Sequence, residues 1–136
     1  MKISFNLPTK AFSVNATYFR NRAFKTPEFR AWEAETAILL DDVKDLTDLA
    51  HEFNRVGGEF WVSFTYVYPY HIYYNKAKDI SAKTFDLSNV EKPLLDQIFG
   101  GRMSVNDRFV TLLRSSKEPG AMHEIRITIE LVPKAA

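Results

Sequence analysis

The stretch Glu59–Tyr70, EFWVSFTYVYPY, constrains the fold more than any other part of the sequence. It is rich in aromatic and β-branched residues, which favour β-strands. Alternate side chains of a strand point to the same face, so this stretch predicts a strand with one apolar face. That face carries Phe60, Val62, Phe64, Tyr66 and Tyr68. Pro69 lacks the N–H that a central strand donates, so it either ends the strand or marks a sheet edge.

Before this strand, the sequence predicts a shorter strand and a helix. Residues 2–7, KISFNL, alternate in the same way as the longer strand. A helix begins at Thr26-Pro27-Glu28, because Thr26 can cap it, Pro27 suits the first turn and Glu28 favours the positive helix end. The apolar stripe of this helix is Phe29, Trp32, Thr36 and either Leu39 or Leu40.

Residues 42–58, DVKDLTDLAHEFNRVGG, form a second helix or continue the first. The helix ends at Gly57-Gly58, since glycine readily adopts the left-handed conformation that closes a helix. Apolar side chains recur along it at helical spacing, at Leu46, Leu49, Ala50 and Phe53.

After the long strand, a loop over residues 71–84 leads to a helix from about Leu87 to Phe99, which closes at Gly100-Gly101. Residues 108–116, RFVTLLRSS, and residues 124–132, EIRITIELV, predict two further strands. The connection KEPGAM between them is short, so the simplest arrangement is a hairpin.

The predicted elements follow the order β-α-(α)-β-α-β-β, and no internal repeat or linker divides them. A chain of 136 residues fits one domain and is long enough to bury a core. We therefore predict a single α+β domain over residues 1–136, in which a small mixed β-sheet is covered by helices packed on one face.

Composition limits the cellular setting. The chain has no cysteine, which excludes disulfides, thiolate zinc sites and a cysteine nucleophile. No apolar run approaches the roughly 20 residues of a membrane span. The N-terminal residues MKISFNLPTK lack the apolar segment of a secretory signal. We expect a cytoplasmic protein with no membrane partner.

Charge is segregated along the chain. A basic group with aromatic neighbours falls mostly in a long irregular stretch, residues 8–26, and loops of this length are often functional. Residues 31–54 are acidic, with Lys44 as their one basic side chain. Basic loops with aromatic residues suit a phosphate backbone and unstacked bases, although solvated loops beside a solvated helix explain the charges too. The basic residues are Lys10, Arg20, Arg22, Lys25 and Arg30, then Lys76, Lys78 and Lys83.

Familiar catalytic motifs are missing from the sequence. There is no glycine-rich phosphate loop, no GxSxG and no HExxH. The histidines are scattered, which is typical of surface and capping positions. Core and sheet packing explains most tyrosines around the long strand, with base stacking as the alternative for Tyr70, Tyr73 and Tyr74.

Carboxylates offer a possible metal site. Asp86 precedes the helix of residues 87–99, Asp96 lies on that helix near the face of Asn89, and Asp107 precedes the next strand. A helix start and a strand start can meet in space, and carboxylates that converge there would bind Mg²⁺ through oxygen. Bound Mg²⁺ generates hydroxide and neutralises a phosphodiester, and Lys92 could stabilise the developing charge at the same point.

Each of these acids also has a purely structural interpretation. Asp86 would cap a helix, Asp96 would lie on a solvated face, and Asp107 would be a turn residue. The spacing alone leaves both interpretations open.

The block DLSNVEKPLLDQIF…VND resembles the RusA family of Holliday-junction resolvases, which is common in phages and prophages. The family pattern is Asp-x-Asp-Asn-x-x-Lys, then Asp on the same helix, then an Asp-Asp pair after a short turn. Asp107 matches the second acid of that pair, where Asn106 stands at the first. The other matching residues are Asp86, Asn89, Lys92 and Asp96.

The N-terminal region is also similar to the family, with a strand, a proline-containing loop, a Ser-x-Asn element at Ser13–Asn15, Tyr18 and a basic stretch that leads into a helix. The resemblance covers nearly the whole chain, but only the block from Asp86 to Asp107 is specific. The acidic helical stretch near Asp41–Glu52 is longer than in compact members.

The resemblance implies a homodimeric endodeoxyribonuclease that binds four-way junctions and makes paired nicks with Mg²⁺, or Mn²⁺ as an alternative, in recombination and repair. It implies that Asp86 and Asp107 are metal ligands, that Lys92 acts near the scissile phosphate, and that Asn89 and Asp96 support the site. It also implies a cytoplasmic setting in a bacterial or phage-infected cell. The DNA would be held by Asn15, Arg20, Arg22, Lys25, Lys76, Lys78 and Lys83.

Position 88 departs from the family, because Ser88 stands where the pattern has a metal-binding Asp. A hydroxyl is a weak, neutral ligand. Either Asp96 or Glu91 supplies the missing carboxylate, or Mg²⁺ binds more weakly through water, or the protein binds junctions without cutting them. The alternative functions are therefore a non-catalytic DNA-binding phage accessory protein and a protein-interaction domain that uses the acidic helix.

Overall fold

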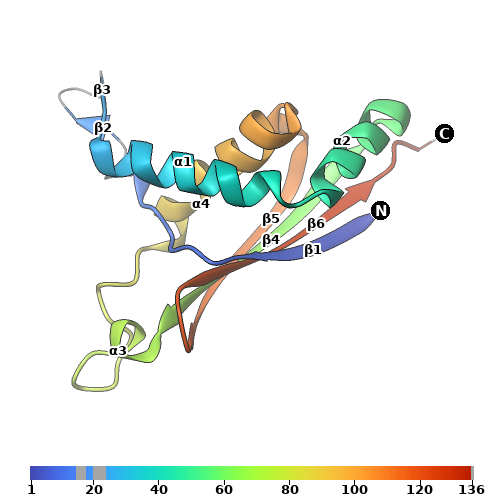
Figure 1. Ribbon diagram of the computed structural model, residues 1–136. Helices are drawn as coiled ribbons and strands as arrows, with labels where there is room; N and C mark the ends of the chain where they lie inside the picture. The colour runs from blue at the N-terminus through green and yellow to red at the C-terminus, as the bar shows by residue number, and fades with distance from the viewer. Residues whose placement is uncertain (15–17, 20–23, 136) are drawn as a thin grey trace.

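The computed structural model describes residues 1–14, 18–19 and 24–135 (Figure 1). The predicted order of strands and helices is confirmed, with short elements added. In chain order, the elements are β1 (Lys2–Leu7), β2 (Tyr18–Phe19), β3 (Phe24–Lys25), α1 (Pro27–Asp41), α2 (Asp45–Val56), β4 (Glu59–Pro69), α3 (Tyr70–Tyr73), α4 (Leu87–Leu95), η2 (Asp96–Met103), η3 (Asp107–Phe109), β5 (Val110–Gly120) and β6 (Glu124–Val132).

The four long strands form one mixed sheet in the order β1-β6-β4-β5. The strand β4 runs parallel to β5 and antiparallel to β6, and β1 pairs antiparallel with β6. A second, two-stranded sheet joins β2 to β3, within the stretch that the sequence predicts as irregular. The fold is thus the predicted α+β class with a mixed sheet.

The predicted hairpin between the last two strands is wrong. The strands β5 and β6 follow each other in the chain but lie on opposite sides of β4. The helix α4 carries the chain back along the sheet after β4, so β5 pairs in parallel, as crossover connections require. This arrangement gives the apolar strand β4 a partner along both edges.

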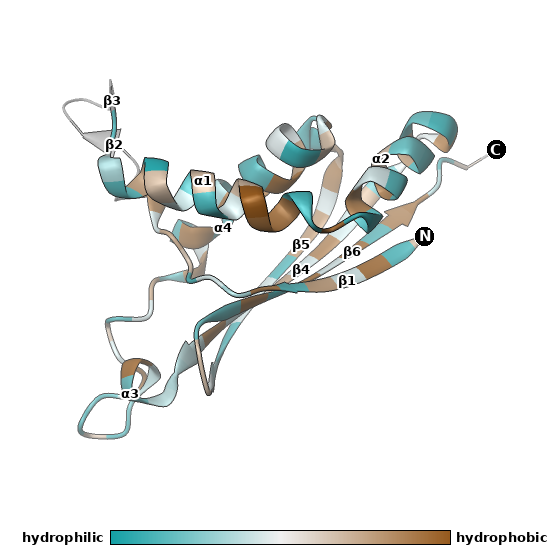
Figure 2. Ribbon diagram, viewed as in Figure 1, coloured by the Kyte–Doolittle hydropathy of each residue, from teal (hydrophilic) through white to brown (hydrophobic). Residues whose placement is uncertain are grey.

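Helices cover one face of the sheet, as predicted (Figure 1). Residues on that face of β4 are buried from Phe60 to Tyr68, and Ile125, Ile127, Ile129 and Leu131 of β6 extend the same apolar layer. Figure 2 shows the alternation as brown and teal bands along the strands. The opposite face carries polar side chains and the exposed Trp61.

The first two helices begin and end for local reasons. The Thr26 hydroxyl accepts a hydrogen bond from the Phe29 N–H at 3.2 Å, which caps α1 as predicted. Leu40, rather than Leu39, completes its buried stripe. A break after Asp41 makes α2 a separate helix, which ends at Gly57 with a φ of 67°. The acids Asp45 and Asp48 lie in its first turn, where the helix dipole favours negative charge.

The helix after Asp86 ends later than predicted. It runs through Gly100 and Gly101 as the π-helix η2 and ends at Ser104, which adopts a left-handed φ of 56°. Pro93 lies inside α4, so the helix lacks one N–H donor just before the change to π-helical bonding. The two glycines therefore lie within the π-helix and do not end it, and the chain reverses at Ser104.

The segment that the sequence predicts as the loop 71–84 includes part of the short helix α3, with the strand-ending Pro69 directly before it. Among the described residues, no helix combines the length and the apolar character that crossing a membrane requires.

Candidate active site

Lys92 joins two carboxylates that the sequence separates. Its Nζ lies 2.8 Å from Oδ1 of Asp96 and 2.8 Å from Oδ2 of Asp107. The Lys92 side chain is 60% exposed and that of Asp96 is 53% exposed, so the group lies on the surface and is open to a macromolecular ligand. We call Lys92, Asp96 and Asp107 the Lys92 cluster.

Two local features build the Lys92 cluster. Asp96 follows Lys92 by four residues, which places both side chains on one helix face. Asp107 arrives from the chain reversal at Ser104, where the Val105 N–H donates to the Phe99 carbonyl at 2.8 Å. The buried Val105 then anchors the returning segment, and Asp107 begins η3 beside Lys92.

Asn106 gives η3 its cap. Its side-chain Oδ1 accepts a hydrogen bond from the Arg108 N–H at 2.8 Å. The Asp107 carboxylate is therefore not needed as the capping group and bonds to Lys92 instead. The interpretation of Asp107 as a plain turn residue is incomplete, because its side chain makes a contact over 15 residues of sequence.

The helix α4, which carries Lys92, packs against the sheet. Val90 and Leu94 are buried, and the Tyr66 hydroxyl on β4 donates to the Val90 carbonyl at 3.3 Å. Burial raises the pKa of Tyr66, which keeps this hydroxyl a donor at every physiological pH. Farther along, Arg102 donates to the Leu40 carbonyl at 3.1 Å and so ties η2 to α1.

Asp86 occupies the N-cap position of α4, but its side chain makes no capping hydrogen bond. Only its backbone carbonyl takes part, as the acceptor for the Asn89 N–H at 2.9 Å. The carboxylate is exposed and forms no ion pair with any residue in the described part of the chain. The capping interpretation therefore accounts for the place of Asp86 and not for its charge.

Ser88 and Asn89 lie in the first turn of α4, where Ser88 is exposed and Asn89 is half-buried. The structure brings Lys92, Asp96 and Asp107 into contact, whereas Asp86 stays outside their hydrogen bonds. Of the acids that the sequence predicts to converge, Asp96 and Asp107 meet at Lys92 and Asp86 does not.

The charges within the Lys92 cluster are strongly coupled. The hydrogen bonds that the Lys92 ammonium donates to Asp107 and then to Asp96 raise the pKa of Lys92 far above its usual range. The ammonium is therefore always charged at neutral pH, and it balances one of two carboxylate charges. One negative charge remains, beside the exposed Asp86 at the start of the same helix.

Two carboxylates of the Lys92 cluster, Asp96 and Asp107, could take part in binding a metal ion. Within residues 1–14, 18–19 and 24–135, no three His, Asp or Glu side chains gather closely enough to hold a metal. Asp96 and Asp107 do share one cation, the Lys92 ammonium, through oxygens on an exposed surface. Mg²⁺ is commonly held by one or two carboxylates together with substrate phosphates, and this donor set suits that mode.

The predicted DNA-binding residues have different surroundings. Asn15, Arg20 and Arg22 lie outside the described residues. Lys25 is engaged by Glu33 of α1 at 3.0 Å and lies over the Phe29 ring at 5.4 Å. A phosphate would have to compete with Glu33 for it.

The lysines of the second basic group are exposed, and no described acid lies within ion-pair distance of them. These are Lys76, Lys78 and Lys83. They are the predicted phosphate contacts that the structure leaves most open.

The tyrosines separate into two kinds. Tyr73 is buried, and its hydroxyl donates to the Lys117 carbonyl at 3.4 Å, so packing explains it. Tyr70 and Tyr74 are exposed, as are Ile80 and Phe85 nearby. Sequence reasoning does not single out Ile80 and Phe85, since neither belongs to a motif and only the fold shows that both remain uncovered.

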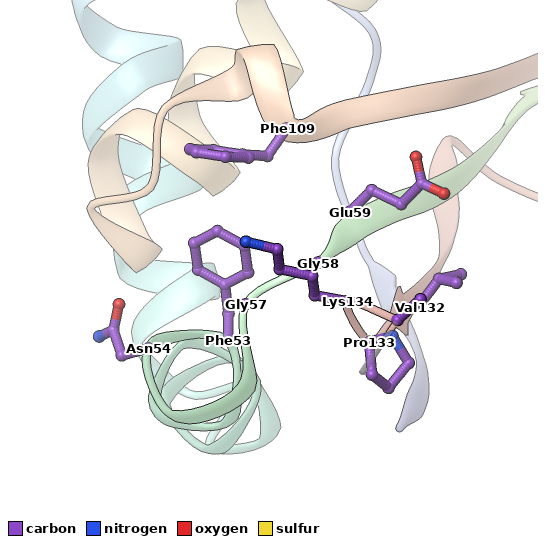
Figure 3. Close-up of a pocket in the computed structure, with 10 residues that line it drawn as sticks. Phe53, Asn54, Gly57, Gly58, Glu59, Phe109, Val132, Pro133 and Lys134 are labelled. Carbon is purple, nitrogen blue, oxygen red and sulfur yellow. The ribbon is translucent and has the colours of Figure 1, made fainter.

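A recess of about 790 Å³ lies between η3, the end of α2 and the C-terminal residues (Figure 3). Phe53 of α2 and Phe109 of η3 line it, with ring centroids 4.9 Å apart. Glu59 and Lys134 supply its charged groups. None of the residues of the Lys92 cluster lines this recess, so it is separate from the carboxylates.

Comparison with known proteins adds no relative, since the sequence matches no protein-family model and no curated protein. The likeness to the RusA family therefore rests on the residues of this chain alone.

Proposed function

We propose that the protein is a Mg²⁺-dependent, structure-selective endodeoxyribonuclease that nicks branched DNA, with four-way junctions as its main substrate. The observation that carries the proposal is the contact of Lys92 with both Asp96 and Asp107 on an open surface. Surface ion pairs of this kind contribute little to stability. In this proposal, the lysine between two acids from separate elements is placed to act on an anionic substrate.

The reaction adds water to a phosphodiester. The water oxygen bonds to phosphorus, one bridging P–O bond breaks, and the leaving oxygen takes up a proton. Asp96 and Asp107, with Asp86 at the start of α4, would hold Mg²⁺, which when bound acidifies water and neutralises phosphate charge. Lys92 is protonated at neutral pH, as lysines ordinarily are, so it would stabilise the extra negative charge of the transition state.

Junction geometry supports a homodimer as the working form. A four-way junction presents two equivalent strands, and a two-fold dimer presents two equivalent sites to them. Paired nicks would follow from this symmetry. Sedimentation of the protein with and without junction DNA tests this part of the proposal.

The direct test is nicking of a synthetic four-way junction beside a linear duplex of the same sequence, in Mg²⁺ and in EDTA. The variant Asp107→Asn removes one carboxylate charge from the Lys92 cluster. Glu35→Gln, at an exposed position of α1, is the matched control. We expect metal-dependent nicks in the junction that Asp107→Asn loses and Glu35→Gln keeps. Equal nicking by all three proteins would contradict the assigned site.

A second candidate function is binding of junction DNA without cleavage. Ser88 favours it, because this exposed hydroxyl stands where the family pattern has an acid and no three-acid group is seen among the described residues. The variant Ser88→Asp separates the two functions. Tight binding without nicks by the natural sequence, with nicks gained in Ser88→Asp, would favour the accessory protein.

A further inference from the structure

Residues 70–85, here called the arm, expose an unusual amount of apolar surface. The arm holds four of the eight exposed large hydrophobic side chains in the described part of the chain. Tyr70 is 61% exposed and Ile80 is 55% exposed, and Tyr74 and Phe85 are close to 40%. Single exposed apolar residues are ordinary, but a group of this size in one short segment indicates a binding surface.

The arm presents these side chains on an ordered frame. The Asn75 side-chain oxygen accepts hydrogen bonds from the backbone N–H groups of Ala77 and Asp79 at 2.9 and 3.0 Å. Tyr74 and Ile80 form a β-bridge next to this turn. The Ser81 N–H then donates to the Tyr73 carbonyl at 2.7 Å. The backbone that carries Tyr74 and Ile80 is therefore ordered before any ligand arrives, which lowers the entropy cost of binding.

The frame is also tied to the sheet. Tyr73 is buried at the base of the arm, and its hydroxyl bonds to the Lys117 carbonyl on β5. In return, the Lys117 ammonium donates to the Thr84 hydroxyl at 3.0 Å and to the Phe85 carbonyl at 3.3 Å. Both ends of the arm are thus fixed to the same strand, although its middle projects beyond the sheet (Figure 1).

The charge of the arm selects an anionic ligand. Its lysines are Lys76, Lys78 and Lys83, against Asp79 as the one acid between residues 70 and 85. Exposed aromatic rings among unpaired lysines suit single-stranded nucleic acid, because each base has a face that stacks and each phosphate has a charge to balance. An acidic protein surface would pair with the lysines, but it offers no bases to stack on the exposed rings.

The position of the arm relates it to the Lys92 cluster. Phe85 is followed directly by Asp86 and then by α4, which carries Lys92 and leads to Asp96. A strand bound along the arm would be led toward the carboxylates. From these observations we infer that the arm stacks unpaired bases on Tyr70 and Tyr74, and that its lysines hold the adjoining phosphates. The inference rests on the proposed function for its role, which is to favour branched DNA over fully paired DNA.

The test measures binding alone, in EDTA, by fluorescence anisotropy with a labelled single strand of about 15 nucleotides and with a matched duplex. The double variant Tyr70→Ala/Tyr74→Ala removes both rings. Tyr70→Phe/Tyr74→Phe keeps the rings and removes the hydroxyls. Ile38→Ala, at an exposed apolar position of α1, is the control for loss of surface apolar area.

We expect the alanine pair to weaken single-strand binding by about tenfold or more, with little change for the duplex. The phenylalanine pair and Ile38→Ala should bind like the natural sequence. Thermal unfolding of each variant checks that the fold is intact. Unchanged single-strand binding by the alanine pair would overturn the inference, and so would an equal loss in the phenylalanine pair. If the alanine pair instead turns a dimer into a monomer and keeps its DNA affinity, the arm is an interface with a second copy.

The outcomes also separate this inference from the proposed function. Single-strand binding that depends on the tyrosine rings, in a protein that does not nick junctions, would support the arm and remove the nuclease. Junction nicking with full selectivity in the alanine pair would leave the nuclease and remove the arm.

Discussion

At the scale of single residues, Lys92 is the centre of the proposed site. Its ammonium lies 2.8 Å from a carboxylate of its own helix and 2.8 Å from one across a chain reversal. Such an exposed lysine has little to contribute to folding, whereas in the proposed nuclease it would stabilise charge beside the scissile phosphate. Stability and activity should therefore respond very differently to its loss.

Replacing Lys92 by methionine keeps the length of the side chain and removes the charge. We expect the free energy of unfolding to change by less than about 1 kcal/mol, because the pairs are surface-exposed. We expect nicking of a four-way junction to fall by about 100-fold or more, as for the loss of one transition-state donor. Denaturant unfolding and single-turnover nicking measure the two effects. A large loss of stability with unchanged nicking would assign Lys92 to structure.

His123 provides a residue-level test of the packing at the far end of the sheet. Its Nδ1 is buried and has no hydrogen-bond partner among the described residues, and its ring centroid lies 5.8 Å from that of Tyr68. Burial, followed by the positive charges of Lys10 and His71, lowers the pKa of His123. The folded state therefore binds this proton less readily than the unfolded chain does.

The free energy of unfolding should consequently fall as the pH drops through and below about 6.5, the usual histidine pKa. His123→Gln should flatten this dependence, and His51→Gln, at an exposed position of α2, should keep it. Urea unfolding between neutral and mildly acidic pH measures the slope. An identical slope in His123→Gln would show that another group causes it.

At the scale of elements, the reversal after η2 decides whether the Lys92 cluster forms. Ser104 takes a left-handed φ of 56°, which lets Val105 bond back to Phe99 and brings Asp107 beside Lys92. This conformation is open to glycine and costly for β-branched residues. Position 104 thus connects backbone geometry to the assembly of the site.

Ser104→Val should destabilise the protein by about 1–2 kcal/mol. It should also reduce nicking, because Asp107 would lose its contact with Lys92. Ser104→Gly should keep both stability and nicking near the natural level, since glycine adopts the same φ without strain. Thermal unfolding and the junction assay, run side by side, measure the two properties. If the valine variant were as stable and as active as the glycine variant, the reversal would not control the site.

The comparison of sequence with structure is also clearest for elements. Local signals predicted well, as in the Thr26 cap, the end of α2 at Gly57 and the buried face of β4. Two local signals misled. Gly100-Gly101 favours a helix end, but the helix continues past both glycines with π-helical hydrogen bonds. The short link after β5 favours a hairpin, but β5 and β6 are not neighbours in the sheet. Which strand pairs with which is decided by the tertiary arrangement around β4, and a local sequence pattern carries no information about it.

The site was predictable in part for the same reason. The spacing of Lys92 and Asp96 follows from helix geometry, so their contact was accessible to sequence reasoning. The approach of Asp107 depends on the tertiary path after Ser104, so the sequence offers it as one possibility, which the resemblance to a family favours. The exposure of Ile80 and Phe85 depends on what the rest of the fold leaves uncovered.

At the scale of the whole molecule, one face of the sheet is covered by helices and the projecting arm leads into the helix of Lys92 (Figure 1). The exposed lysines of the arm precede Asp86 and the Lys92 cluster in the sequence. If they bind phosphates, DNA affinity should depend on salt through the release of counterions.

The triple variant Lys76→Ala/Lys78→Ala/Lys83→Ala should weaken binding to junctions and to single strands alike. It should also lower the slope of log affinity against log salt by about 2 units, at roughly 0.7 unit for each phosphate contact with single strands. Titrations at several salt concentrations give the slope. A variant with reduced affinity and the natural slope would mean that these lysines act through structure and not through phosphate contacts.

The measurement that tests the central claim most directly is a nicking assay on a four-way junction, with a linear duplex of the same sequence beside it. The natural protein and Asp107→Asn are compared in Mg²⁺ and in EDTA. We expect nicks that require Mg²⁺, favour the junction and disappear in Asp107→Asn. Tight junction binding with no nicks in Mg²⁺ or Mn²⁺ would contradict it and would leave a protein that acts on branched DNA by binding alone.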